Sequence, residues 1–279
     1  MLIDFLNDYY QADLKSIHDV AGNQHLVGES RLYHAKLFVK IFKEKEMFYA
    51  EQHVNEVYAP DVYLDNVIFE DNYVVTLQDR QMQELEDQQI DGNLAYQFGK
   101  LLAEFHNKVT GKVLVYEDQR PLSLQIKAKA ERLKTSAYAA PILTSLNLLQ
   151  ADFSRADEEY EQLPKVVLHG DFSVRNIMKY REKLVLIDFE RSKVGVTYQD
   201  FIKFFYNEVK DPRFRQQFLD GYEAMHQFEI PSHELQRCLL LRSALEICEY
   251  NTTHPSKKYG TMAQQMLATI KNGDAVLSL

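Results

Sequence analysis

Hydrophobic and polar residues follow two different periods along the chain, and the change between them separates two parts. Up to residue 79, short apolar runs rich in β-branched and aromatic residues alternate with turn residues, a pattern typical of β-strands. It predicts strands at residues 37–42, 62–64, 67–69 and 73–78, and a glycine-containing hairpin at residues 20–30. A helix at residues 44–57 interrupts these strands and ends before Pro60.

From Asp91 onwards the apolar residues recur every three or four positions, which is the period of an amphipathic helix. The first such helix begins near a capping Asp91 or Asn93 and ends at Gly111. Its apolar stripe consists of Leu94, Phe98, Leu101, Leu102, Phe105 and Val109. Further helices are predicted at residues 123–138, 141–163 and 235–250. A strand-rich first part followed by a mostly helical second part predicts an α+β fold.

The second part contains a stretch whose spacing indicates phosphoryl transfer. In a His-Gly-Asp segment, Asp171 is followed five residues later by Asn176, and an apolar strand at residues 184–187 then ends in Asp188. Asp171 would accept or orient the proton of an acceptor hydroxyl. Asn176 and Asp188 offer one neutral and one charged oxygen ligand for magnesium, which completes its shell with phosphate and water. Each half taken alone is also compatible with an ordinary turn or strand end.

These segments resemble the catalytic loop and the metal-binding strand of the aminoglycoside phosphotransferase and choline kinase families. Those families share the protein-kinase-like fold but read His-Gly-Asp for His-Arg-Asp and Asp-Phe-Glu for Asp-Phe-Gly, as this chain does at residues 169–171 and 188–190. The resemblance implies a two-lobed fold, with a small β-rich, nucleotide-binding N-lobe at residues 1–79 and a larger, mostly helical C-lobe at residues 80–279. It also implies that the γ-phosphoryl group of ATP or GTP, with Mg²⁺, is transferred to a hydroxyl of a small metabolite or antibiotic, with Asp171 as base.

Lys40 stands inside the apolar run of residues 37–42, so its ammonium group must either face solvent or meet a buried anion. By resemblance, Lys40 pairs with the α and β phosphates of the nucleotide, and a glutamate of the following helix orients it. Glu51 and Glu56 both lie in that helix. Glu51 matches the family's Phe-x-x-Glu spacing better, because Phe48 stands three residues before it. Either glutamate is also compatible with a solvated helix face.

Two other segments are candidates for nucleotide contact. Gly22 and Asn23 lie in the predicted hairpin, where backbone amides can approach phosphate oxygens, although ordinary hairpins also carry glycine at their turns. Leu77, Gln78 and Asp79 end the first part and, by resemblance, form the hinge whose backbone binds the adenine edge. The alternative for this second segment is an edge strand that enters an acidic loop.

The charge balance bears on the partners. The chain carries 41 acidic and 32 basic residues, a net charge of −9, which argues against nucleic acid or an anionic membrane and is compatible with a cationic ligand. Glu246 and Glu249 share one face of the predicted helix at residues 235–250, and a desolvated pair there would hold the ammonium group of a small cationic acceptor. The alternative is a solvated helix face.

Nothing in the sequence directs the chain out of the cytoplasm. The residues at its start carry acidic rather than basic charge, and no apolar run approaches the ~20 residues of a membrane-spanning helix. Cys238 and Cys248 lie in one predicted helix, about 15 Å apart, which is too far for a disulfide. We therefore expect a cytoplasmic protein with reduced cysteines.

Two other function classes compete with a small-molecule kinase. A protein kinase would carry Ala-Pro-Glu after Asp188 and a longer activation segment, and the chain has neither. A nucleotide-binding scaffold without transfer activity would not need Lys40, Asp171, Asn176 and Asp188 together. The sequence does not identify the acceptor, the choice between ATP and GTP, or the oligomeric state.

Overall fold

The chain forms two compact units that are discontinuous in sequence. The computed structural model describes residues 1–20, 23–85, 89–110, 113–274 and 276–277. Unit 1 comprises residues 1–89, 101–116 and 169–194, and unit 2 comprises residues 90–100, 117–168 and 195–279. Unit 1 therefore gathers the strand-rich first part of the chain with the segment that carries Asp171 and Asp188. The lobe boundary after residue 79 stays a prediction.

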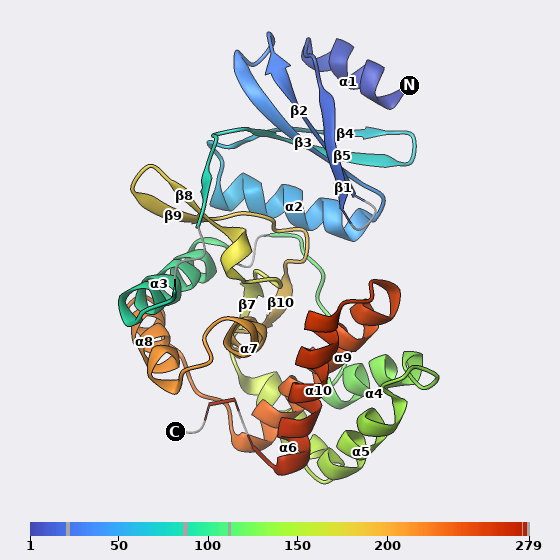
Figure 1. The fold of residues 1–279 in the computed structure, drawn as a ribbon, viewed down its shortest axis with the longest axis vertical. Helices are drawn as coiled ribbons and strands as arrows, with labels where there is room; N and C mark the ends of the chain where they lie inside the picture. Colours follow the sequence, from blue (N-terminus) through green and yellow to red (C-terminus); the bar gives the residue numbers. More distant parts are fainter. Residues whose placement is uncertain (21–22, 86–88, 111–112, 275, 278–279) are drawn as a thin grey trace. The chain divides into compact units, whose positions relative to one another are not determined.

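Unit 1 is built on a five-stranded antiparallel sheet with the strand order β1-β2-β3-β5-β4 (Figure 1). Its strands are β1 (Lys15–Val20), β2 (Asn23–Ser30), β3 (Ala35–Phe42), β4 (Tyr63–Phe69) and β5 (Asn72–Gln78). The predicted strands at residues 62–64 and 67–69 are one continuous strand, because the polar residues between them, Asp65 and Asn66, pair with Thr76 and Val75 of β5. A register shift between Tyr63 and Asp65 leaves Leu64 without a partner in this ladder. Strand β1 was not predicted, since its residues are mostly polar.

The side chains of β3 alternate between the two faces of this sheet. Leu37, Val39 and Ile41 belong to a core cluster that the N-terminal helix α1 (Leu2–Tyr10) helps to form. Phe42 belongs to a second cluster with Phe48 of helix α2 (Lys45–Tyr58), which lies against the sheet in Figure 1. Because side chains two residues apart share a face, Lys40 is directed to the same face as Phe42, toward α2.

The segment that carries the predicted catalytic residues completes unit 1. It consists of the 3₁₀ turn η1 (Val174–Asn176) and strands β8 (Ile177–Tyr180) and β9 (Lys183–Leu186), which form a small sheet with β6 (Gln83–Glu84) in the order β6-β8-β9. Behind it, Phe189 stacks on Phe105 of helix α3 (Gly92–Lys108) with ring centroids 5.6 Å apart, and the rings of Tyr58 and His169 contact both. This aromatic cluster fixes the backbone on either side of Asp188.

Helix α3 begins in unit 2 and continues into unit 1. Its cap is Asp91, whose carboxylate accepts a hydrogen bond from the amide of Leu94 at 2.8 Å, so Asp91 rather than Asn93 has the predicted capping role. The other elements are α4 (Leu122–Arg132), α5 (Ala139–Leu149), α6 (Phe153–Gln162), β7 (Lys165–Leu168), β10 (Lys193–Val196), α7 (Tyr198–Asn207), α8 (Pro212–Glu223), α9 (His233–Thr253) and α10 (Lys257–Asn272).

Two helix predictions in unit 2 were wrong in their extent. The helix predicted at residues 123–138 ends at Arg132, because the amide and the hydroxyl of Ser136 both donate to the carbonyl of Leu133 in a tight turn. The stretch predicted at residues 141–163 is two helices, α5 and α6. A tight turn separates them, in which the amide of Asp152 donates to the carbonyl of Leu149 at 3.0 Å. An uninterrupted leucine pattern concealed this break.

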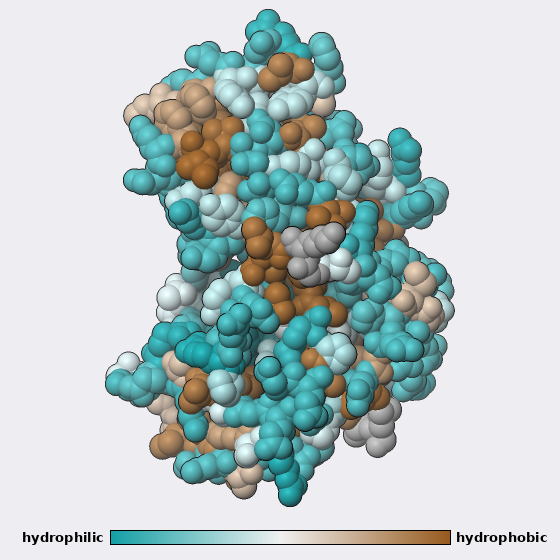
Figure 2. Space-filling view, turned by 180° about the vertical axis from the view of Figure 1, so that it is seen from behind, coloured by the Kyte–Doolittle hydropathy of each residue, from teal (hydrophilic) through white to brown (hydrophobic). Residues whose placement is uncertain are grey.

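Helix α9 supplies much of the buried surface of unit 2. It covers the predicted helix at residues 235–250 and contains Cys238 and Cys248, which are free thiols with no exposed surface. Burial raises the pKa of each thiol to about 12, which keeps both protonated and unreactive. Among the described residues, no helix combines the length and the apolar character that crossing a membrane requires. Figure 2 shows hydrophilic residues over most of the face drawn there, with hydrophobic residues in separate groups.

Candidate active site

The loop that precedes Asp171 requires glycine at one position. Gly170 has a φ angle of +78°, and a Cβ atom there would lie 2.0 Å from the carbonyl oxygen of Arg191. Next to it, the buried ring of His169 receives the amide N–H of Asp171 on Nδ1 at 3.4 Å, and its Nε2 donates to the carbonyl of Ile187 at 3.1 Å. The His-Gly pair thus sets the backbone of Asp171 and links it to the strand that ends in Asp188.

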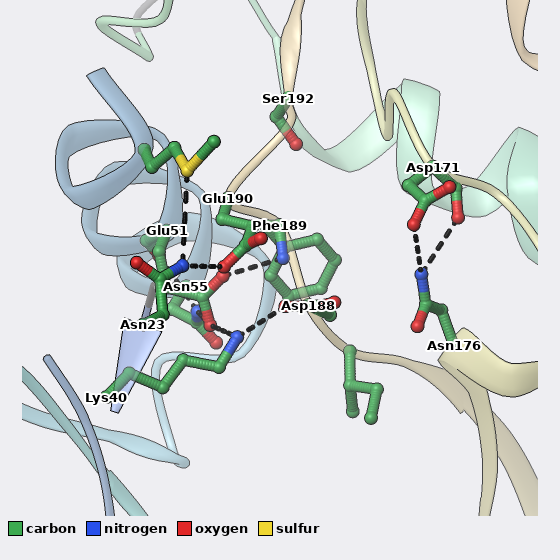
Figure 3. A network of polar contacts seen from close by, with 12 residues as sticks. Asn23, Lys40, Glu51, Asn55, Asp171, Asn176, Asp188, Phe189, Glu190 and Ser192 are labelled. Carbon is green, nitrogen blue, oxygen red and sulfur yellow. Dashed lines mark hydrogen bonds and ion pairs between the residues drawn. The ribbon is translucent and has the colours of Figure 1, made fainter. Parts of the chain in front are cut away.

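Asp171 and Asn176 face each other across this loop. The amide nitrogen of Asn176 donates to the backbone carbonyl of Asp171 at 2.9 Å and lies 3.4 Å from its carboxylate oxygen Oδ2. Both side chains are almost fully buried. Figure 3 shows that the amide oxygen of Asn176 consequently points away from Asp171. The hydrogen bonds therefore orient Asn176 so that its oxygen, rather than its nitrogen, is presented to a cation.

The ammonium group of Lys40 contacts two carboxylates. Of the two predicted alternatives, solvent and a buried anion, the structure therefore shows the buried anion. Its ammonium nitrogen lies 2.8 Å from Oε1 of Glu51 and 2.6 Å from Oδ1 of Asp188, and its side chain is 6% exposed. Burial acts against the positive charge, but the two carboxylates outweigh it and raise the pKa of Lys40 above its ordinary value. Lys40 therefore remains a cation inside unit 1 (Figure 3).

Glu51, rather than Glu56, is the partner of Lys40. While Oε1 of Glu51 faces Lys40, Oε2 accepts a hydrogen bond from the backbone amide of Phe189 at 2.7 Å, and Asn55 donates to Oε1 at 3.2 Å. Glu56 is exposed and accepts from Gln52 of its own helix. One buried carboxylate thus joins strand β3, helix α2 and the Asp-Phe-Glu segment.

Asp188 has a strained backbone. Its φ angle is +69°, in the left-handed region that side-chain-bearing residues seldom occupy. Its side chain is 32% exposed, in contrast to those of Lys40 and Glu51. Burial of the carboxyl group opposes ionisation, but Lys40 lowers the pKa of Asp188 below its ordinary value. The result is an ionised, partly accessible carboxylate at the predicted metal position.

Glu190, two residues further on, was not singled out in the sequence. Burial, followed by the charge of Asp188, raises its pKa to about 7. Its Oε2 accepts a hydrogen bond of 3.0 Å from the side-chain amide of Asn23, at the start of β2 (Figure 3). Asn23 therefore binds the Asp-Phe-Glu segment through its side chain. Gly22, the other hairpin residue predicted to contact phosphate, lies outside the described residues.

The predicted hinge residues have most of their backbone donors engaged within the protein. The amide of Gln78 donates to Val62 and that of Asp79 to Lys36, each at 2.8 Å, and the carboxylate of Asp79 pairs with Lys36 at 2.7 Å. Leu77 occupies a ladder position between β3 and β4, with its side chain largely buried.

Adenine recognition at this strand end would therefore fall to carbonyl groups and to the next amide. Within the part of the chain that the structure describes, the backbone N–H of Arg80 has no protein acceptor.

Arg175 is a residue at the site that the sequence analysis missed. Its Nη2 atom forms an ion pair with the carboxylate oxygen Oδ2 of Asp171, four residues earlier. The guanidinium-bearing side chain is 59% exposed, whereas that of Asp171 is 4% exposed. Its place between Asp171 and Asn176 in the sequence was the available signal, because a side chain inside so short a loop cannot lie far from either end.

Glu246 and Glu249, the predicted acceptor pair, lie on α9 in unit 2 and already have cationic neighbours. Glu249 receives two hydrogen bonds from the guanidinium of Arg132, at 2.5 and 3.1 Å. Glu246 lies 3.5 Å from the ammonium of Lys129 and 3.7 Å from the guanidinium of Arg242. An ammonium ligand would have to compete with these partners, so the acceptor role of the pair stays a prediction that this geometry does not favour.

A model of the phosphotransferase enzyme family matches residues 31–234. The chain belongs to this family. The match spans the Lys40–Glu51 pair, the catalytic loop and the strand that ends in Asp188. A search of curated proteins finds no match.

Solved structures of similar fold include kinases that act on small molecules. A thermostable mutant of aminoglycoside phosphotransferase APH(4)-Ia shares 15% identity at a TM-score of 0.70, over 97% of this chain and 98% of that chain. Amicoumacin kinase hAmiN, in complex with AMP-PNP, Ca²⁺ and Ami, shares 13% identity at 0.66, over 99% and 95%. Plasmodium vivax ethanolamine kinase shares 14% identity at 0.63, over 95% and 83%.

These comparisons confirm the predicted class of fold and of enzyme. The fold is the α+β, protein-kinase-like fold of the aminoglycoside phosphotransferases. The family assignment makes the chain a phosphotransferase, as the two short motifs indicated. At identities of 13–15%, these structures show the fold and do not identify the acceptor.

Proposed function

We propose that this protein transfers the γ-phosphoryl group of ATP to a hydroxyl group of a small molecule. The observation that carries the proposal is the buried contact of Lys40 with both Glu51 and Asp188. In protein kinases the corresponding strand lysine belongs to the ATP site, and its ion pair with a glutamate must be in place for activity. A structural lysine would not need two carboxylates from separate segments, one of them held in a strained backbone conformation.

Asp171 would act on the acceptor side of the reaction. Its carboxylate accepts or orients the proton of the acceptor hydroxyl while that oxygen forms a bond to the γ-phosphorus. The bond between the γ-phosphorus and the bridging oxygen breaks at the same time, and ADP leaves. The hydroxyl proton passes to Asp171 and from there to solvent. The hydrogen bonds from His169 and Asn176 keep Asp171 in position during this step.

Asn176 and Asp188 fit a magnesium ion bound together with the nucleotide. Asn176 presents an oxygen because its nitrogen is bound to Asp171, and Asp188 presents an ionised, partly exposed carboxylate. These are the hard oxygen donors that magnesium takes, with phosphate and water oxygens completing the shell. When bound, the ion neutralises charge on the phosphate oxygens. Lys40 contributes a further positive charge, because the pKa of this side chain is raised rather than lowered by its surroundings.

We place the binding site for the adenine edge at the end of β5. Leu77, Gln78 and Asp79 would contribute backbone carbonyl groups, and Arg80 an amide donor. The start of β2, with Gly22 and Asn23, would lie against the phosphates. Whether ATP or GTP is preferred depends on this edge. We propose ATP as the first nucleotide to test, because neighbours of this fold were solved with ADP or AMP-PNP.

We propose a small hydroxylated amine or amino sugar as the acceptor. Structural neighbours were solved with hygromycin B and with amicoumacin, and another is an ethanolamine kinase. Together with the net charge of −9, they make hydroxylated amines and amino sugars the first candidates. The reaction should take place in the cytoplasm, where ATP and magnesium are available. No nucleic acid or membrane surface is required as a partner.

The proposal is tested by replacing Asp171 with asparagine. Asp171→Asn keeps the size and the hydrogen-bond acceptor oxygen but removes the carboxylate that receives the proton. We expect turnover to fall by roughly 100- to 10,000-fold, with MgATP affinity and the urea midpoint nearly unchanged. ATP consumption across a panel of hydroxylated amines, amino sugars and neutral sugars provides the measurement.

Asp220→Asn is the matched control for this substitution. Asp220 is an exposed aspartate that accepts a hydrogen bond from Gln216 on α8. The Asp220→Asn variant should retain wild-type turnover. An Asp171→Asn variant that keeps more than about a tenth of wild-type turnover on the best acceptor would remove Asp171 from the role of base.

A further inference from the structure

The loop between Asp171 and Asn176 carries a positive charge that contacts the proposed base. The guanidinium of Arg175 pairs with Oδ2 of Asp171, the same oxygen that Asn176 approaches at 3.4 Å. The side chain of Asp171 is 4% exposed and that of Arg175 is 59% exposed, so the pair joins a buried carboxylate to a cation that solvent reaches. A group that binds at the carboxylate of Asp171 therefore lies close to this cation.

A positive charge next to Asp171 would reduce the electrostatic repulsion between negative groups in the proposed reaction. The transferring phosphoryl group carries negative charge on its equatorial oxygens, and Asp171 brings a second negative charge close to them. Lys40 is held by Glu51 and Asp188, on the nucleotide side of the site. At Asp171, where the acceptor hydroxyl is proposed to bind, Arg175 supplies a cation in direct contact with the carboxylate. An arginine placed beside a transferring phosphoryl group stabilises the charge that develops in the transition state.

Two features make Arg175 suited to this task. It belongs to η1, and its side-chain nitrogen returns to a residue four positions earlier, so its position is set by the same short turn that positions Asp171 and Asn176. The guanidinium group also has five N–H donors in a planar fork, so it can hold a carboxylate and a phosphoryl oxygen at the same time. A lysine in its place would offer a single point charge without that geometry.

We propose that Arg175 is a catalytic residue that remains on Asp171 and contacts the oxygens of the transferring phosphoryl group. This inference rests on the phosphotransfer proposed above and names a further residue of the same site. It predicts that the contact is stronger in the transition state than with bound ATP, because the γ-phosphoryl group moves toward the acceptor oxygen at Asp171, and so toward the guanidinium, only as it is transferred. Loss of Arg175 should therefore lower the rate far more than it weakens ATP binding.

The test uses the full-length chain with MgADP and aluminium fluoride, a combination that mimics a phosphoryl group in transfer and needs no identified acceptor. Wild type is compared with Arg175→Gln, Arg175→Lys and Arg31→Gln. Arg31 is an exposed arginine in the turn after β2, at the end of the hairpin away from Lys40, and its backbone bond to Gln11 survives the substitution. Calorimetry gives the affinities, and the slow hydrolysis of ATP, with water as acceptor, gives kcat and KM.

We expect Arg175→Gln to lower kcat by roughly 100- to 1,000-fold and to weaken the fluoroaluminate complex by a similar factor, with the Kd of MgATP changed less than about threefold. Arg175→Lys should recover part of both losses, and Arg31→Gln should match wild type. Equal loss of MgATP and fluoroaluminate binding in Arg175→Gln would overturn the inference, as would unchanged or faster turnover. If fluoride and aluminium did not tighten ADP binding to wild type, both this inference and the proposed phosphotransfer would be wrong.

Discussion

Replacing Glu51 with glutamine tests whether the buried carboxylate organises the site. Oε1 of Glu51 faces the ammonium of Lys40 and the amide of Asn55, while Oε2 accepts from the backbone N–H of Phe189. Each of these three partners is a hydrogen-bond donor. Glutamine has the same shape but a single oxygen, so one side of the new amide must set an N–H group against another donor in either orientation.

The expected loss of stability follows from these contacts. A buried donor left without an acceptor costs about 1–3 kcal/mol. Breaking a buried ion pair by removing one partner costs about 3–5 kcal/mol, but Lys40 keeps the carboxylate of Asp188 at 2.6 Å, so part of that cost is avoided. We therefore expect Glu51→Gln to lower the free energy of unfolding by about 2–4 kcal/mol. The value of kcat/KM should also fall, because Lys40 and the Phe189 backbone lose their common anchor.

Urea-induced unfolding at 25 °C, followed by circular dichroism, measures the stability change. Glu56→Gln is the matched control, because Glu56 lies on the same helix and its carboxylate is exposed, with Gln52 as its partner. That variant should stay within about 0.5 kcal/mol of wild type. If Glu51→Gln and Glu56→Gln were equally stable and equally active, the buried network would not organise the site, and the assignment of Glu51 as the partner of Lys40 in catalysis would be refuted.

Two further predictions concern the metal and the acidic pair of unit 2. Asp188→Ala should weaken ATP binding at least tenfold in the presence of Mg²⁺ and much less without it, as measured by calorimetry; equal affinities with the metal present would contradict the metal assignment. Hydrogen bonding to Arg132, followed by the charge of Lys129, lowers the pKa of Glu249 below its ordinary value of 4.5, with burial acting in the opposite direction. The resulting stabilisation is present above pH 4.5 and is lost as the pH falls through the lowered pKa. Because the pair is partly exposed, the free energies of unfolding of wild type and Glu249→Gln, measured with urea, should differ by less than about 1 kcal/mol near pH 7 and should converge in acid. A difference that widened in acid would refute this.

The sequence predicted those parts of the site that depend on spacing within one segment. Asp171 and Asn176 lie five residues apart in one loop, so their proximity follows from the chain itself. The position of Lys40 inside an apolar run likewise predicted that its ammonium group either faces solvent or meets a buried anion, and the structure shows the contact with the anion. Glu51 was preferred to Glu56 by the position of a phenylalanine, and that preference agrees with the observed contact. The roles of these residues in catalysis stay predictions.

Contacts between distant segments could not be predicted in the same way. The hydrogen bond between Asn23 and Glu190 joins residues 167 positions apart, and it exists because the sheet and the Asp-Phe-Glu segment pack into one unit. Nothing in the local pattern of either residue indicates the other. The prediction of helix boundaries was wrong for a related reason. The turn before Asp152 is defined by backbone hydrogen bonds that a run of leucines does not reveal. The loop of Asp171 and Asn176 is recognisable in sequence because the residues that define it are close together in the chain.

The charges around Asp171 restrict which cationic acceptors are suitable. Two like charges 4 Å apart repel each other by about 4 kcal/mol at an effective dielectric constant of 20, and the repulsion falls inversely with distance. For an amine adjacent to the reacting hydroxyl, the guanidinium of Arg175 would therefore offset the attraction of the Asp171 carboxylate, with which it is paired. An amine several bonds away would escape most of this repulsion. Net charge of −9 and a cation at the reacting centre are therefore compatible, provided that the acceptor carries its positive charge away from the hydroxyl that is phosphorylated.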